Sequence, residues 1–175
     1  MRKIGLNVGS GQRRFTSTAE VEWVNVDKLQ RLDRPNHVPD LVCEGNNLPY
    51  GDGSVDYYVL HHCLEHEPQG GGGLIEEAYR VLKPEGSLLI FLPDIWALAV
   101  RWLAGGISDY IYIVNLMGAY IDDEADRHKW HYTVESLTET VAERGFTRYF
   151  PFDWRTIPGS DCARDWWIMA MEVKK

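Results

Sequence analysis

Short apolar runs alternate along this chain with turn signals and segments of helical periodicity, and this rhythm constrains the fold more than any other feature. The runs predict strands over residues 3–8, 22–26, 40–43, 55–60, 87–92, 147–152 and 166–173. Helices are expected over residues 74–82, 95–104 and 107–120, and after an N-cap at Thr133. Such alternation is typical of an α/β fold with an open, mostly parallel sheet. The 175 residues are expected to form a single domain.

Two turn signals flank the helix expected over residues 74–82. The segment Lys83-Pro84-Glu85-Gly86 should end it, because proline lacks the backbone N–H that continues a helix. On its other side, residues 70–73 are four consecutive glycines. We expect these glycines to form a flexible loop rather than a phosphate cradle, since no strand leads directly into them.

Charge and cysteine content limit the kinds of ligand and the cellular compartment that we expect for this chain. The chain has 18 basic and 26 acidic side chains, a net charge of −8, so the basic footprint of a nucleic-acid binder is missing. Three cysteines, Cys43, Cys63 and Cys162, form no CxxC pair and predict reduced thiols. The first residues, MRKIGLNVGS, lack the apolar stretch of a signal peptide. These features predict a cytoplasmic protein with a small ligand.

The most apolar segment, residues 95–120, is the one candidate for a membrane span. Arg101, the pair Gly105-Gly106, Asp109 and Asn115 interrupt it, and a charge at the centre of a spanning helix is costly. Two packed helices are therefore expected, with no membrane contact. They carry more apolar surface than one small sheet must bury, which favours a homodimer.

Three loops that follow strands carry residues suited to a nucleotide-like ligand. Gly9-Ser10-Gly11 allows a tight turn with a ligand close to the backbone. Asp27, after the second strand, can accept hydrogen bonds from both hydroxyls of a ribose. Glu44 opens a turn-rich loop that can contact a purine. Each feature also has an interpretation without a ligand: a tight turn for the glycines, a solvated carboxylate for Asp27 and an Asx turn for the loop from Glu44.

A nicotinamide cofactor is disfavoured by one position in the first of these loops. The dinucleotide fingerprint GxGxxG requires a third glycine at position 14, where this chain has arginine. A nucleotide-dependent oxidoreductase is therefore the weakest of the alternatives.

Taken in order, six segments resemble the class I S-adenosylmethionine-dependent methyltransferases, and within them the small methyltransferase-11-like group. The matching segments are LNVGSG (6–11), EWVNVD (22–27), EGNNLPYGDGSVD (44–56), LHHCLEH (60–66), EEAYRVLKPEGSLLIFLPD (76–94) and HKWHYTVESLTETVAERGF (128–146). The resemblance implies a Rossmann-like three-layer sandwich around a mostly parallel seven-stranded sheet with a reversed last strand. Residues 1–94 would then form the cofactor-binding half and residues 95–175 a substrate-side half with inserted helices.

The resemblance also implies a site for S-adenosyl-L-methionine across the carboxyl ends of the first four strands. Carried over by position, the cofactor-binding residues are Val8, Gly9, Ser10 and Gly11 under the methionine part, Asp27 and Lys28 at the ribose, Glu44, Gly45, Asn46, Asn47 and Leu48 around adenine, and His61 near the methyl group. His62 is the expected general base, with Asp94 and His128 as polar groups on the substrate side. The methyl acceptor would be an unidentified small molecule or saccharide.

The chain departs from the family pattern around the second strand. Residues 16–20 leave room for barely one helical turn, and residues 28–40 contain Pro35 and Pro39. The N-terminal side of the fold is therefore expected to be trimmed, which would permit a partner or a second copy to complete the pocket. It also keeps open the alternative of a catalytically silent binding or scaffold module.

The run His61-His62-Cys63-Leu64-Glu65-His66 offers imidazole and thiolate groups, which are zinc ligands. No CxxC or HExxH spacing supports such a site, and neighbouring positions just past a strand point in different directions. His128 and His131 also fit loop capping or core packing. We therefore expect no metal ion.

Overall fold

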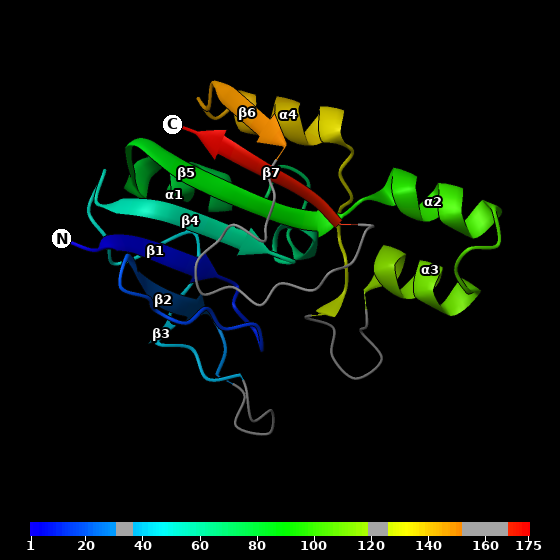
Figure 1. Ribbon diagram of the computed structural model, residues 1–175, viewed down its shortest axis with the longest axis horizontal. Coiled ribbons are helices and arrows are strands. Elements are labelled where there is room, and N and C mark those ends of the chain that lie inside the picture. Colours follow the sequence, from blue (N-terminus) through cyan, green and yellow to red (C-terminus); the bar gives the residue numbers. More distant parts are fainter. Residues whose placement is uncertain (31–36, 119–125, 152–167) are drawn as a thin grey trace.

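The computed structural model describes residues 1–30, 37–118, 126–151 and 168–175. Within these residues, seven strands form one sheet in the order β3-β2-β1-β4-β5-β7-β6 (Figure 1). The strands are β1 (Lys3–Val8), β2 (Val21–Asp27), β3 (Leu41–Val42), β4 (Val55–His61), β5 (Leu82–Pro93), β6 (Arg148–Pro151) and β7 (Ile168–Lys174). β7 runs antiparallel to both β5 and β6, while the pairings from β3 to β5 are parallel. The mostly parallel seven-stranded sheet with a reversed last strand is confirmed.

The two faces of the sheet are covered differently. Helices α1 (Leu74–Val81) and α4 (Val134–Ala142) contribute to the same large apolar cluster as Leu60 and Ile90 of the sheet. Because side chains alternate along a strand, the intervening residues point to the opposite face. There a smaller cluster contains Phe15, Val21, Trp23, Val59, Leu89 and Phe91. Helices α1 and α4 thus pack on the same face of the sheet.

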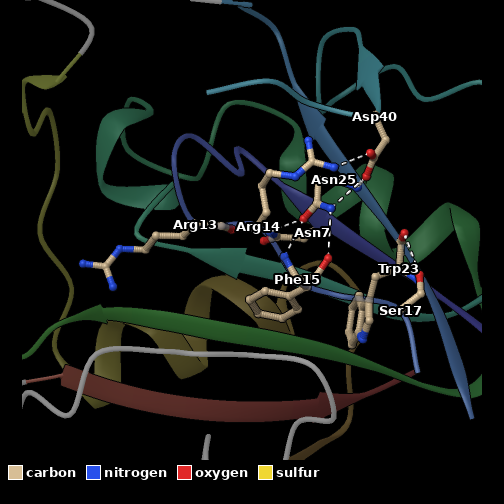
Figure 2. Close-up of polar contacts among 8 residues, drawn as sticks. All are labelled: Asn7, Arg13, Arg14, Phe15, Ser17, Trp23, Asn25 and Asp40. Carbon is tan, nitrogen blue, oxygen red and sulfur yellow. Dashed lines mark hydrogen bonds and ion pairs between the residues drawn. The ribbon is translucent and has the colours of Figure 1, made fainter. Parts of the chain in front are cut away.

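A buried polar network takes the place of a helix between β1 and β2. Asn25 accepts a hydrogen bond from the backbone N–H of Phe15 at 2.7 Å and donates to the carbonyl of Phe15 at 3.1 Å (Figure 2). It also donates to Asp40 at 2.7 Å, and Asp40 forms an ion pair with Arg14. Asn7 donates to Asn25 and to the carbonyl of Arg13. Residues 9–20 therefore connect β1 to β2 without a helix, as the trimmed pattern predicted.

The end of α1 and the start of β5 differ from expectation. α1 ends at Val81, as Pro84 requires, but β5 begins at Leu82 rather than at Ser87. Along β4 the paired residue of β5 changes from Leu82 to Ser87 within two positions. The intervening turn signal is thus accommodated as an irregularity within the strand, where Glu85 adopts a positive φ of 65°.

Helices α2 (Ile95–Leu103) and α3 (Asp109–Met117) project beyond the carboxyl end of β5 (Figure 1). The stacked rings of Trp102 and Tyr112, 4.6 Å apart, join them. Two packed helices are confirmed, and no helix in the described part of the chain is long and apolar enough to span a bilayer. Their exposed side chains include Trp96, Val100, Leu103, Tyr110 and Ile113. The homodimer stays a prediction.

The loop after β3 is anchored to α1 by a buried carboxylate. Glu77, whose side chain is 8% exposed, accepts from the backbone N–H of Leu48 at 2.7 Å and from Arg80 at 2.6 and 2.9 Å. Arg80 donates in turn to the carbonyl of Tyr50 at 2.7 Å. Burial opposes ionisation, but these hydrogen bonds hold the pKa of Glu77 below its usual value. This anchor fixes the loop that carries residues 44–48.

We expect Glu77→Ala to lower the free energy of unfolding by about 2 kcal/mol, because it leaves the buried N–H of Leu48 without its acceptor and removes the ion pair with Arg80. Glu76→Ala is the matched control, since its side chain is 53% exposed and pairs only at the surface with Arg144. Urea denaturation measures both changes. Equal denaturation midpoints for the two variants would show that the anchor contributes little.

Candidate cofactor and active site

The glycine loop after β1 turns tightly against β2 and β4. Gly9 has a φ of +66°, and a Cβ there would lie 2.3 Å from the Sγ of Cys63. Only glycine therefore fits. The next two residues are tied to β2: the Ser10 N–H donates to the carbonyl of Val26 at 3.0 Å, and the Gly11 N–H donates to Asp27 at 2.9 Å.

Asp27 stands at the end of β2 with its side chain 11% exposed. Its Oδ2 accepts from Gly11, and its Oδ1 accepts from the Leu29 N–H at 3.0 Å. The Nε2 of His37 lies 3.5 Å from Oδ2. A carboxylate has about four acceptor positions. Asp27 can therefore keep these contacts and still accept from a ligand.

These loops border a cavity of about 250 Å³ at the carboxyl ends of β1, β2 and β4. Eight of the residues expected at the cofactor line it: Val8, Gly9, Gly11, Asp27, Lys28, Glu44, Gly45 and Asn46. His62, the expected base, lines it too. The tertiary structure thus brings three separate loops and one strand end to a single cavity.

Four other expected cofactor residues are not among the lining. Ser10 is buried, Asn47 is exposed, and Leu48 belongs to the large apolar cluster. His61 packs edge-on against Phe91 at 5.3 Å, on the face of the sheet that carries the smaller cluster. Alternation along β4 accounts for this, since adjacent residues point to opposite faces. Burial, with the neighbouring His62 and Arg13, lowers the pKa of His61 to about 3.

His62 is held in an unusual conformation beside a buried carboxylate. Its φ is +50°, a region that histidine rarely adopts, and its N–H donates to the carbonyl of Phe91 at 3.0 Å. Its Nδ1 lies 3.1 Å from Oε1 of Glu65, whose side chain is 1% exposed. Burial opposes ionisation of Glu65, but His62 and nearby imidazoles hold the pKa of its carboxyl below its usual value. Such a carboxylate favours a proton on Nδ1 and leaves Nε2 as the basic nitrogen.

The other two expected catalytic residues lie outside the cavity lining. Asp94 caps α2, with its Oδ1 accepting from the N–H groups of Trp96 and Ala97 at 3.0 Å. His128 packs edge-on against His66, with ring centroids 4.9 Å apart. Burial lowers the pKa of His128 to about 4, so its ring is neutral at pH 7.

Several lining residues were not anticipated as cofactor or catalytic positions. They are Leu29, His37, Cys43, Cys63, His66, Glu67, Gly72, Leu74, Asp126 and Lys129. The glycine loop over residues 70–73 supplies one of them, and Asn46 donates to the carbonyl of Gly72 at 3.0 Å. Because this contact joins segments that are distant in the sequence, the run of glycines by itself did not predict it. Cys43 and Cys63 are unpaired thiols, and Cys162 lies outside the described residues.

The fold is similar to that of solved S-adenosylmethionine-dependent methyltransferases. Residues 6–90 match the methyltransferase-11 family model, which is described as a methyltransferase domain. Together these findings support a class I S-adenosylmethionine-dependent methyltransferase. The match spans the glycine loop, Asp27 and the segment from Glu44 to His62.

Solved structures with similar folds come from several organisms. A methyltransferase from Thermotoga maritima, described as a possible histamine N-methyltransferase, is 18% identical with a TM-score of 0.62, covering 100% of this chain and 83% of its own. One from Archaeoglobus fulgidus is 16% identical with a TM-score of 0.61, covering 99% and 86%. A Burkholderia thailandensis N1-methyltransferase, solved with 1,6-didemethyltoxoflavin and S-adenosylhomocysteine, is 19% identical with a TM-score of 0.58, covering 99% and 71%. At these identities the likeness shows the fold. No curated protein matches the sequence.

Proposed function

We propose that this chain binds S-adenosylmethionine in the cavity and transfers its methyl group to a small-molecule or saccharide acceptor. The observation that carries the proposal is the convergence of the glycine loop, Asp27 and the loop from Glu44 to Asn46 on one cavity that also contains His62. The absence of a Cβ at Gly9 lets the loop over residues 9–11 pack closely against Cys63, which also lines the cavity. Asp27 would hold the ribose, and the backbone and side chains of residues 44–46 would surround adenine.

The charges around the cavity suit a cationic ligand. Asp27, Glu44, Glu67 and Asp126 line it together with Lys28 and Lys129, so acidic side chains exceed basic ones. S-adenosylmethionine supplies an electrophilic methyl group on a positively charged sulfur. A negative surrounding attracts such a group. The chain's net charge of −8 acts in the same direction.

The protein's own part is to orient the acceptor and to take its proton. Orientation for an in-line transfer can contribute about 7–11 kcal/mol to lowering the barrier. His62 would remove the proton from an acceptor hydroxyl or ammonium through Nε2, while Glu65 fixes the ring. Since Nε2 is buried without a hydrogen-bond partner in the described residues, it is available for this role.

Calorimetric titration of the purified chain with S-adenosylmethionine, S-adenosylhomocysteine and NAD tests the proposal. We expect micromolar binding of the first two and no measurable binding of NAD. Production of S-adenosylhomocysteine on addition of fractionated metabolite extract would then identify the acceptor. Failure to bind any of the three would favour a scaffold module, and preference for NAD would favour an oxidoreductase.

We expect His62→Ala to lower the turnover number about 100-fold, because general-base catalysis typically contributes at least that factor. Its affinity for S-adenosylhomocysteine should change less than threefold, since cofactor binding rests on the other loops. His131→Gln is the matched control, as His131 is outside the cavity lining. Full turnover by His62→Ala on the identified acceptor would remove His62 from the mechanism.

A further inference from the structure

Three side chains from two distant parts of the chain meet beside the cavity. Glu65 and His66 lie in the short 3-10 helix that follows β4, and His128 lies in the segment before α4. One ligand atom from each residue lies within 4.8 Å of those of the other two. Their chain separation explains why no fixed spacing in the sequence revealed this cluster.

The cluster contains polar atoms that are buried without partners. Oε2 of Glu65 and Nδ1 of His128 have no hydrogen-bond partner in the described part of the chain, although the Glu65 side chain is only 1% exposed. Burying a carboxylate oxygen without a hydrogen-bond partner costs free energy, so such a group calls for an explanation. A ligand that accepts electron pairs from both atoms would satisfy them.

The other polar atoms of these side chains already make contacts outside the cluster, as the side chains of metal ligands usually do. Nδ1 of His66 lies 3.1 Å from the carbonyl of Arg127, which leaves Nε2 for a ligand. His128 forms a hydrogen bond to the backbone of Asn115. The second oxygen of Glu65, Oε1, contacts His62 at 3.1 Å. Metal-bound histidines and carboxylates are typically fixed by outer contacts of this kind.

We propose that Glu65, His66 and His128 bind one divalent first-row transition-metal ion at the edge of the cofactor cavity. Two imidazoles and one carboxylate suit Mn²⁺, Fe²⁺, Co²⁺ or Zn²⁺, whereas Mg²⁺ and Ca²⁺ prefer oxygen ligands. Ligand atoms around such an ion lie about 3–3.5 Å apart, so small side-chain rotations close the site. Three protein ligands leave coordination positions open. A metal ion here would differ from the expectation of no metal, which rested on the sequence spacing alone.

The coordination positions that the protein leaves open on the ion indicate which class of methyl acceptor fits. This part of the inference rests on the proposed function. His66 belongs to both the cluster and the cavity lining, so the ion would lie next to the cavity. An acceptor hydroxyl bound to the ion would be more acidic, and its proton would pass to Nε2 of His62. The oxygen would then form the bond to the methyl carbon as the carbon–sulfur bond breaks, releasing a neutral thioether. The acceptor is thus a hydroxyl compound able to bind a metal.

Titration of chelator-treated protein with Co²⁺ tests the site without an acceptor. We expect one saturable site per chain with visible d–d absorption and a micromolar dissociation constant. Glu65→Gln and His66→Asn should each weaken Co²⁺ binding at least 100-fold. His131→Asn is the matched control, because His131 packs near His128 at 5.8 Å but is outside the cluster, and its affinity should stay within threefold.

Circular dichroism and urea denaturation of each variant separate a lost site from a lost fold, and His66, which is half-buried, is the safer substitution. No saturable Co²⁺ binding, wild-type affinity in Glu65→Gln or in a folded His66→Asn, or tighter binding of Mg²⁺ than of Mn²⁺ would overturn the assignment. Titration of the metal-free protein with S-adenosylhomocysteine reports on the proposed function separately. A chain that binds this nucleoside but not Co²⁺ keeps the function and loses the metal.

Discussion

Asp27→Ala is expected to weaken binding of S-adenosylhomocysteine about 100-fold or more. The substitution removes the acceptor for two ribose hydroxyls, and a hydrogen bond to a charged acceptor contributes about 1.5–3 kcal/mol. It also removes the contact that ties the Gly11 N–H to β2 at 2.9 Å. The glycine loop would therefore lose part of its fixed position under the ligand. Calorimetric titration measures the change.

Two further variants separate the ribose contact from general damage to β2. Asp27→Asn keeps the shape and one acceptor oxygen, so its loss should be intermediate. Glu22→Ala removes an exposed carboxylate on the same strand, which pairs with Arg2 away from the cavity, and should bind as wild type does. If Asp27→Ala and Glu22→Ala bind S-adenosylhomocysteine with equal affinity, Asp27 does not bind the ribose.

His61→Leu is expected to reduce the loss of stability that the wild type suffers between pH 6.5 and 3, while the losses from His128 and from the carboxyl groups with lowered pKa remain. His61 is 4% exposed, both its ring nitrogens lack hydrogen-bond partners in the described residues, and its pKa is lowered from 6.5 to about 3. The folded protein therefore keeps this ring neutral where the unfolded chain protonates it. Stability from this group is complete above pH 6.5 and falls by about 1.4 kcal/mol per pH unit as the pH drops toward 3.

Urea denaturation at half-unit pH steps, with a chelator present, measures that slope in the wild type and the variant. The difference between the two curves should grow steadily below pH 6.5 and vanish above it. Leucine should also pack well between Phe15 and Phe91 and leave stability at pH 7.5 unchanged or higher. Parallel curves, or an NMR titration of the His61 ring near pH 6.5, would contradict a buried neutral imidazole.

The trimmed side of the fold and the proposed site are connected through the same segment. Residues 9–20 contain both the loop over residues 9–11 and Phe15, whose carbonyl accepts a hydrogen bond from Asn25, which also donates to Asp40. Whether a protein partner or a second copy completes the pocket of this chain stays a prediction.

The sequence by itself determined the strands, their approximate ends and the loops that carry the proposed cofactor residues. Alternation and turn chemistry are local properties, so β1 was predicted to the residue and Thr133 was identified as the cap of α4. The segment order also supported the methyltransferase class, because the motifs from Gly9 to Asp94 are each read along the chain. Eight of the expected cofactor residues also line one cavity, but the sheet order is what brings their loops together there.

Only the tertiary structure decided which side chains meet. His61 and His62 are neighbours in sequence, yet one packs against Phe91 and the other faces the cavity, because strand alternation and a positive φ separate them. Glu65 meets His128 through the packing of a short 3-10 helix against the segment before α4. Such contacts depend on how elements that are distant in the sequence pack together, which local sequence patterns do not predict. The candidate metal site therefore appears only in the tertiary structure, whereas the loops proposed to hold the cofactor are recognisable in the sequence.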